Sequence, residues 1–313
     1  MDRLTVLCFA GTYALALAAE LARFWVRGNV RWYATVGLTS LAWLVQTAYL
    51  VNLAMVRQAI PVTTAFESVM VLSWMFALIG LYLMVHSTRQ TAIGLFVLPL
   101  VIGLATVAAW SAPRESDWKN WGSLTAFWGT VHGLFLMGGA VFSCVAFAAG
   151  LMYLAQSYRL KSKKPARFGL ALPSLEQSER VNRGAITLAF PLLTFGLVIG
   201  VILGVAAHRR TSPGGDGYAM APVGPHATLS WSDPKVISTI LTWGVFAVLL
   251  HARYRPAMRG RGVMLLSIVA FGFLVFTWVG ISALSLPTTH NVRRVPVKAG
   301  PAASSSTEGV VNP

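Results

Sequence analysis

Histidines inside or beside apolar stretches are the side chains of this 313-residue chain best suited to chemistry. A polar group at membrane depth is costly unless it has a partner or a task. His132 lies about 9 Å into the apolar stretch that begins near residue 126, at 1.5 Å per residue. Trp128 precedes it by four residues and therefore shares its helical face. His290 follows the last apolar stretch, so it can approach the level of His132 if the two helices are neighbours.

His251 lies at a different depth. It follows Asp233, the expected start of its helix, by 18 residues, or about 27 Å along the axis. This places His251 near the opposite membrane face, at the level of His86. A zinc site needs converging ligands, whereas imidazoles at two depths suit axial ligation of haem iron. A histidine at a membrane interface can equally be an amphipathic residue at a wet boundary, and both interpretations stay open at this point.

Membrane-spanning helices are the elements expected to hold these residues. The chain is 56% hydrophobic and 11% charged, whereas a soluble domain carries about 25% charged residues. This composition excludes a water-soluble globule and predicts an all-α polytopic membrane protein. Stretches that reach the roughly 20 residues needed to cross a bilayer number about eight and lie near 4–25, 33–56, 66–86, 91–110, 126–155, 184–207, 235–252 and 262–286.

Basic residues predict the orientation of these helices, because Lys and Arg concentrate on the cytoplasmic side. The loops after the first, third, fifth and seventh stretches hold 15 of the 25 Lys and Arg residues, most densely from Arg159 onward. We therefore expect both termini outside the cell's inner (plasma) membrane. Residues 1–290 form the expected transmembrane domain, and residues 291–313 an expected disordered extracytoplasmic tail rich in Pro, Ala and Ser.

Several chemistries find no support in the sequence. Neither a nucleotide-binding loop nor a catalytic triad nor a nucleic-acid module is present, so we expect no nucleic-acid partner. The basic segment after the fifth stretch is interpreted as a contact with anionic lipid of the bilayer. The two cysteines, Cys8 and Cys144, form no C-x-x-C-H motif and therefore attach no haem covalently.

Local signals define two helix boundaries and one helix contact. Asp233 followed by Pro234 predicts an N-cap and a first helical residue, and Thr64 with Glu67 resembles a capping box. The glycines at 196, 200 and 204 form a ridge of small residues for close helix packing. Such a ridge could also let a flat macrocycle approach the backbone, and both interpretations are kept.

Taken in order, these segments resemble the membrane-embedded cytochrome c assembly proteins that handle haem, known as CcsA or ResC, with CcmC as a relative. The similarity covers roughly residues 60–290. Its main stretches are Leu172 to Gly184 continuing into Phe190 to Gly196, then Asp233-Pro-Lys with Leu241-Thr-Trp and Leu250-His-Ala-Arg, and finally Glu67-Ser-x-x-x-Leu-Ser-Trp74.

The resemblance implies roles for individual residues. His132 and His290 match the two outer histidines that ligate haem iron in the family, and His251 matches the histidine lower in the membrane. The haem, of type b, would be cargo or substrate. In the family the inner histidine pairs with one from a CcsB-like (ResB-like) membrane partner; here the pairing residue would come from such a chain or from His86. An apocytochrome c would receive the haem.

The chain departs from the family in its aromatic platform. The family reads W-G-x-x-W-x-W-D-P-K-E where this chain reads Thr-Leu-Ser-Trp231-Ser-Asp233-Pro-Lys-Val. A porphyrin needs apolar faces to replace its lost water contacts, and one indole supplies less surface than three. Trp231 and Asp233 are therefore expected at the site, with Trp128 among the residues that could compensate.

Three functions follow as hypotheses. The first is haem export and presentation for covalent attachment to apocytochrome c, in which the chain is at most part of a cytochrome c synthase complex. The second is a b-type haem electron-transfer subunit. The third is a HemX-like membrane regulator or scaffold of haem biosynthesis, which would keep the fold without the platform.

Overall fold

A computed structural model of the chain describes residues 2–25, 29–57, 60–62, 65–87, 91–110, 124–162, 171–211, 233–252 and 260–280. Within those ranges the chain is helical and has no β-strand, which confirms the all-α prediction. The helices are α1 (Asp2–Leu21), α2 (Asn29–Arg57), α3 (Ala65–His86), α4 (Gly94–Trp110), α5 (Leu124–Lys161), α6 (Leu175–Thr211), α7 (Pro234–Ala252) and α8 (Arg261–Val275), with a short 3-10 turn (Ala22–Phe24) after α1 and a π-helical turn (Phe276–Gly280) after α8.

Six of the described helices are long and apolar enough to cross a membrane, namely α2, α3, α5, α6, α7 and α8 with the turn after it. Residues Gly94–Ala109 of α4 form a shorter apolar helix. A polytopic membrane protein is therefore confirmed. The count of eight spans and the outer position of both termini stay predictions, as does the tail at residues 291–313, which lies outside the described residues.

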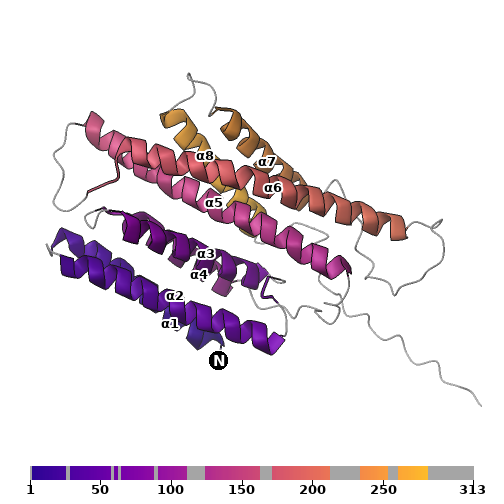
Figure 1. Cartoon of the computed structure of the whole chain (residues 1–313), viewed down its shortest axis with the longest axis horizontal. Helices are drawn as coiled ribbons and strands as arrows, with labels where there is room; N and C mark the ends of the chain where they lie inside the picture. The colour runs from indigo at the N-terminus through magenta and orange to yellow at the C-terminus, as the bar shows by residue number, and fades with distance from the viewer. Residues whose placement is uncertain are drawn as a thin grey trace, which may run out of the picture.

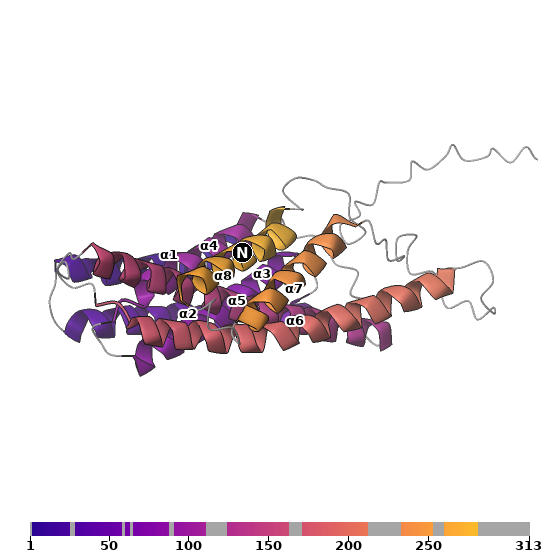
Figure 2. The ribbon, with the colours of Figure 1, turned by 90° about the horizontal axis from the view of Figure 1, so that it is seen from above.

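The helices form two groups of four that lie side by side along the long axis of the molecule (Figure 1). In one group α1 packs against α2 and α4, and α3 packs against α4. In the other, α5 packs along α6 and against α8, while α7 lies against α6 and α8. Figure 2 shows α6 extending past α7 and α8 at one end of the bundle.

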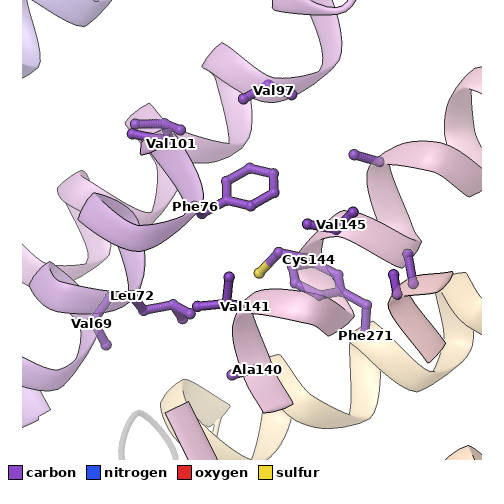
Figure 3. Close-up of a cluster of buried hydrophobic side chains, with 14 of the residues drawn as sticks. Val69, Leu72, Phe76, Val97, Val101, Ala140, Val141, Cys144, Val145 and Phe271 are labelled. Carbon is purple, nitrogen blue, oxygen red and sulfur yellow. The ribbon is translucent and has the colours of Figure 1, made fainter. Parts of the chain in front are cut away.

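The two groups meet where α5 packs against α3 and α4. Figure 3 shows Phe76 of α3 and Val101 of α4 on one side of this contact, with Cys144 of α5 and Phe271 of α8 on the other. All four side chains are buried. Apolar packing therefore continues from one group into the other through this cluster.

Helix α6 begins earlier than the sequence indicated. The apolar pattern placed its start near residue 184, but the helix starts at Leu175, where Ser174 accepts a hydrogen bond from the Gln177 backbone N–H at 3.1 Å. The first turns carry Glu176–Arg180 and Glu179–Arg183 ion pairs at 2.8 and 2.7 Å. Such i,i+4 pairs support a solvated helix, so this segment is a helical extension of the span.

Candidate functional site

The His132 imidazole is held between α5 and α6. Its Nδ1 lies 2.7 Å from the backbone oxygen of Gly196, and the side chain is half-buried. A carbonyl oxygen can only accept a hydrogen bond, so Nδ1 carries the proton and Nε2 keeps its lone pair. Histidines that ligate a metal usually donate their second ring N–H to a carbonyl or carboxylate in this way. In this chain the same arrangement makes Nε2 the ring nitrogen that would bind a metal.

Two glycines of α6 make room for this contact. A Cβ on Gly200 would lie 2.6 Å from Cε1 of His132, and a Cβ on Gly196 would lie 2.6 Å from Cδ2 of Leu136. Real Cβ atoms do not approach that closely, so the two helices can pack this tightly only over glycine. The interpretation of the ridge as a helix-packing surface is thus confirmed at these two positions, where α5 side chains cover it.

A small cavity lies beside Leu136, one helical turn after His132 on α5. It has a volume of about 30 Å³ and is lined by Leu136, Leu193, Thr239, Thr242, Trp243, Leu274, Thr277 and Trp278. A cavity of this size has room for a water molecule, whereas pockets for small-molecule ligands measure roughly 300–1,000 Å³. A tetrapyrrole therefore does not fit inside it. A macrocycle bound at His132 would have to lie on the side of the cavity where α5 begins.

Hydroxyl and indole groups surround the cavity. The Trp243 indole N–H donates to Thr194 Oγ1 at 2.9 Å, and the Ser238 and Thr277 hydroxyls share a hydrogen bond. Thr277 and Trp278 belong to the π-helical turn that follows α8. Single π-turns inside membrane or soluble helices occur often at functional sites. The polar lining is thus made by α7 and the turn after α8, and α6 contributes Leu193.

Asp233 acts as the N-cap of α7. Its Oδ1 accepts a hydrogen bond from the Lys235 backbone N–H at 2.8 Å, and the helix begins at Pro234. The residue is buried, with 3% of its surface exposed. The predicted cap is confirmed, so this carboxylate stabilises the N-terminal end of α7. The neighbouring Lys235 is half-buried.

The other predicted site residues are distributed differently. Trp128 is 43% exposed and makes an edge-to-face contact with Phe127, with ring centroids 5.6 Å apart. His251 is exposed in the last turn of α7. His86 is also exposed, and its Nδ1 lies 3.0 Å from the Tyr82 oxygen. His86 and His251 are not gathered around His132, whereas Trp128 lies one helical turn before it on α5.

Two further predicted residues, His290 and Trp231, lie outside the described residues. Their roles as an outer iron ligand and as the remaining platform residue stay predictions. Within the described ranges, no group of three or more His, Cys, Asp or Glu side chains is placed to hold a metal ion.

The structure also shows a buried ion cluster that the sequence reasoning missed. Glu20 pairs with Arg23 at 3.2 Å and with Arg31 at 3.0 Å, and Thr35 donates to it at 3.4 Å. Glu20 and Arg23 are 4% and 3% exposed. Arg23 lies in the 3-10 turn after α1, and Arg31 lies in the first turn of α2. An acidic residue three positions before an arginine was the available signal.

Part of this chain is similar to a known protein family. Residues 62–207 match the family model described as cytochrome C assembly protein. This segment is similar to the cytochrome c assembly family. It spans α3, α4, α5 and most of α6, including His132 and both glycines against which it packs. The resemblance inferred from the sequence is thereby confirmed.

Curated relatives extend the similarity over most of the chain. Protein HemX of Brevibacillus brevis is 27% identical over 251 residues, which cover 79% of this chain and 83% of the relative. Cytochrome c biogenesis protein CcsA of Guillardia theta is 24% identical over 293 residues, covering 86% and 91%. Protein HemX of Bacillus subtilis is 21% identical over 249 residues, covering 79% and 83%. No solved structure matches the chain.

These findings support a membrane protein with a role in cytochrome c biogenesis or haem handling. The similarity to this family also implies an involvement of haem.

Proposed function

We propose that this protein holds haem b as cargo at the outer end of its second helix group and presents it for covalent attachment to an apocytochrome c. The observation that carries this proposal is the His132 imidazole, whose Nδ1 is fixed by the Gly196 carbonyl at 2.7 Å. That contact leaves Nε2 as the atom that can bind iron.

The residues around His132 fit such a cargo in part. An imidazole, a half-buried cation and a ridge of glycines meet at the ends of α5, α6 and α7. The cavity beneath them is too small for a tetrapyrrole. The macrocycle would therefore lie toward the outer face, where the sequence places Trp231 and His290. His290 is proposed as the second outer ligand, and His251 as a ligand at the opposite end.

Each of the chain's own groups then has a defined task. His132 would bind the iron through Nε2, and the Gly196 carbonyl would hold its ring in place. The haem supplies the vinyl groups that react with cysteine thiols of the apocytochrome, so the chain contributes orientation rather than bond chemistry. We expect a CcsB-like membrane protein as partner and the inner membrane as location. The chain would be at most one part of a ligating complex.

Spectroscopy of the purified full-length protein tests this function. The wild-type protein is expected to bind haemin with the absorption spectrum of a low-spin imidazole complex. His132→Gly removes the ligand and is expected to weaken binding at least tenfold, and added imidazole should restore the spectrum because it refills the vacated ligand position.

Tyr158→Gly is the matched control, since Tyr158 is an exposed aromatic side chain near the other end of the same helix. It should leave the haemin spectrum and affinity unchanged. Identical haemin binding by the wild-type protein and His132→Gly would remove His132 from the site.

A second function is favoured by the two HemX relatives and by the incomplete tryptophan motif. In this alternative the chain is a membrane regulator or scaffold of haem biosynthesis that does not deliver haem. A deletion strain separates the two functions. Loss of all c-type cytochromes supports delivery, whereas altered haem synthesis with normal c-type cytochromes supports the regulator.

A further inference from the structure

The buried ion cluster between α1 and α2 carries more positive than negative charge. Glu20, in the last turn of α1, pairs with Arg23 at 3.2 Å and with Arg31 at 3.0 Å. A single carboxylate is thus shared by two guanidiniums. Because a charge removed from water is costly unless an opposite charge compensates it, the cluster is suited to an additional anion.

Arg31 is the less compensated of the two arginines. Arg23 follows the C-terminal end of α1, where the helix dipole is negative and favours a cation. Arg31 lies in the first turn of the 29-residue helix α2, where the dipole is positive and favours an anion. A bound anion at Arg31 would therefore be stabilised by both the guanidinium and the helix end.

The Arg31 guanidinium has donors to spare. Its Nη1 donates to Glu20 Oε2 at 3.0 Å, and Glu20 is the acceptor that the described residues provide for it. The side chain is 11% exposed, so its other N–H groups are not sealed inside the protein. A guanidinium presents five N–H donors in a planar fork. One edge can stay on Glu20 while the other binds a phosphate through two hydrogen bonds.

The carboxylate that positions Arg31 is held in place from several sides. Glu20 is 4% exposed, and the Thr35 hydroxyl donates to its Oε2 at 3.4 Å. The first residue of α4 covers it, since a Cβ on Gly94 would lie 3.2 Å from Glu20 Cγ. Glu20 therefore cannot turn outward, and Arg31 is oriented in advance, unlike an arginine that extends on a flexible stem from a membrane protein's surface.

The cluster lies at the end of the bundle opposite His132. The Ala92 backbone N–H, just before α4, donates to the Ala171 oxygen, just before α6, at 2.8 Å. His132 packs instead against Gly196, in the second half of α6. The end of α1, the start of α2 and the start of α4 therefore share the end that the basic residues predict to be cytoplasmic.

Exposed apolar side chains flank Arg31 at this level. Val30 precedes it, Tyr33 follows it by two residues, and Trp25 lies in the turn after α1; these side chains are 78%, 54% and 82% exposed. Tryptophan and tyrosine concentrate at the level of the lipid headgroups. Arg31 thus lies where a phospholipid can offer its phosphate to the guanidinium and its acyl chains to the neighbouring apolar surface.

We propose that Arg31 binds the phosphate of an anionic phospholipid at the junction of α1 and α2. The proposal does not depend on haem binding. It includes a preference among lipids, because phosphatidylcholine carries a cation of its own beside the phosphate, whereas phosphatidylglycerol does not. The uncompensated charge of the cluster should therefore select phosphatidylglycerol.

Native mass spectrometry of the purified full-length protein in detergent tests this preference, with dioleoyl phosphatidylglycerol and dioleoyl phosphatidylcholine titrated separately. The wild-type protein is expected to bind the first phosphatidylglycerol about tenfold more tightly than phosphatidylcholine, the effect of one charge-assisted interaction. Arg31→Gln should remove this preference and leave phosphatidylcholine binding unchanged. Arg31→Lys keeps a charge beside Glu20 but lacks the two-edged fork, so it should fold and lose most of the preference.

Arg180→Gln is the matched control. Arg180 is an exposed arginine that also pairs with a glutamate, in the first turns of α6 at the same end of the bundle, and its loss should leave the preference intact. An unchanged preference in Arg31→Gln, or a full preference in Arg31→Lys, would overturn the proposal. So would displacement of phosphatidylglycerol by an equal concentration of inorganic phosphate, because the ligand would then be free phosphate and not a lipid.

Discussion

The His132 imidazole is oriented by a backbone carbonyl of another helix. The Gly196 oxygen already belongs to a helical turn, and its second lone pair accepts the imidazole N–H at 2.7 Å. The tautomer is therefore set by how α5 and α6 pack. An acidic side chain in this position would place a negative charge beside the imidazole. The backbone carbonyl orients the ring without adding a charge.

This contact also marks a limit of sequence reasoning at the residue scale. His132 was identified because an imidazole at membrane depth needs a partner, but the partner is 64 residues away and is a main-chain atom. No pattern of side chains in the sequence indicates which main-chain oxygen His132 will contact.

The buried Glu20 carboxylate gives a prediction on stability. Glu20→Gln leaves the Arg23 and Arg31 guanidiniums without their carboxylate in a buried place. Removing one partner of a buried ion cluster costs about 3–5 kcal/mol, so the melting temperature of the purified protein in detergent should fall clearly. Glu176→Gln is the comparison, because its ion pair with Arg180 is exposed and such pairs contribute about 1 kcal/mol or less. Equal melting temperatures for both variants would contradict a stabilising role for Glu20.

At the scale of elements, the helix starts show what local sequence determines. The start of α7 was predicted correctly, because an N-cap depends on atoms within three residues, here Asp233 Oδ1 and the Lys235 N–H. The start of α6 was placed nine residues late. Apolar residues begin near 184, whereas the helix begins at Leu175 and is stabilised by charged pairs. The length of an apolar stretch indicates the part of a helix that lies in the membrane, and the helix itself can be longer.

The contact between α5 and α6 gives a prediction at this scale. Gly200→Ala would place a methyl group 2.6 Å from Cε1 of His132, so the ring must turn away and lose its bond to Gly196. Haemin affinity is expected to fall several-fold, measured by absorbance titration of the purified protein. Gly184→Ala lies on the same helix with nothing within 4 Å of the new methyl group. It should bind haemin normally and be stabilised by about 0.5–1 kcal/mol, as alanine favours helix over glycine. Normal haemin binding by Gly200→Ala would contradict the prediction, because it would show that haemin affinity does not depend on the orientation of the His132 ring.

At the scale of the whole molecule, the two helix groups meet through apolar side chains, while the polar groups of the candidate site lie within the second group. Phe76, Cys144 and Phe271 fill the contact between the groups (Figure 3). His132 and the hydroxyl-lined cavity lie among α5 to α8. The first group therefore supports the second by packing against α5, and its own buried polar atoms, such as Gln46 bonded to Tyr13 at 2.9 Å, serve its internal contacts.

Connections between helices show which ends of the two groups lie together. The Ala92 backbone N–H donates to the Ala171 oxygen at 2.8 Å, and Thr91 forms an isolated bridge with Ala171. The segment before α4 therefore lies beside the segment before α6. Both segments follow basic residues, which concentrate on the cytoplasmic side of membranes. The end of the bundle opposite His132 is accordingly expected to face the cytoplasm.

Cysteine labelling tests this orientation for the full chain. Cys8→Ser with Cys144→Ala removes both natural thiols, and Lys161→Cys or Ser306→Cys then adds one at the end of α5 or in the C-terminal tail. A maleimide that cannot cross membranes should label intact cells at position 306 and leave position 161 unlabelled, because the basic end is expected inside. Both thiols should react after permeabilisation, which controls for expression and reactivity. Labelling of position 161 but not 306 in intact cells would invert the topology and place His132 on the cytoplasmic side, where it could not present haem to an apocytochrome outside.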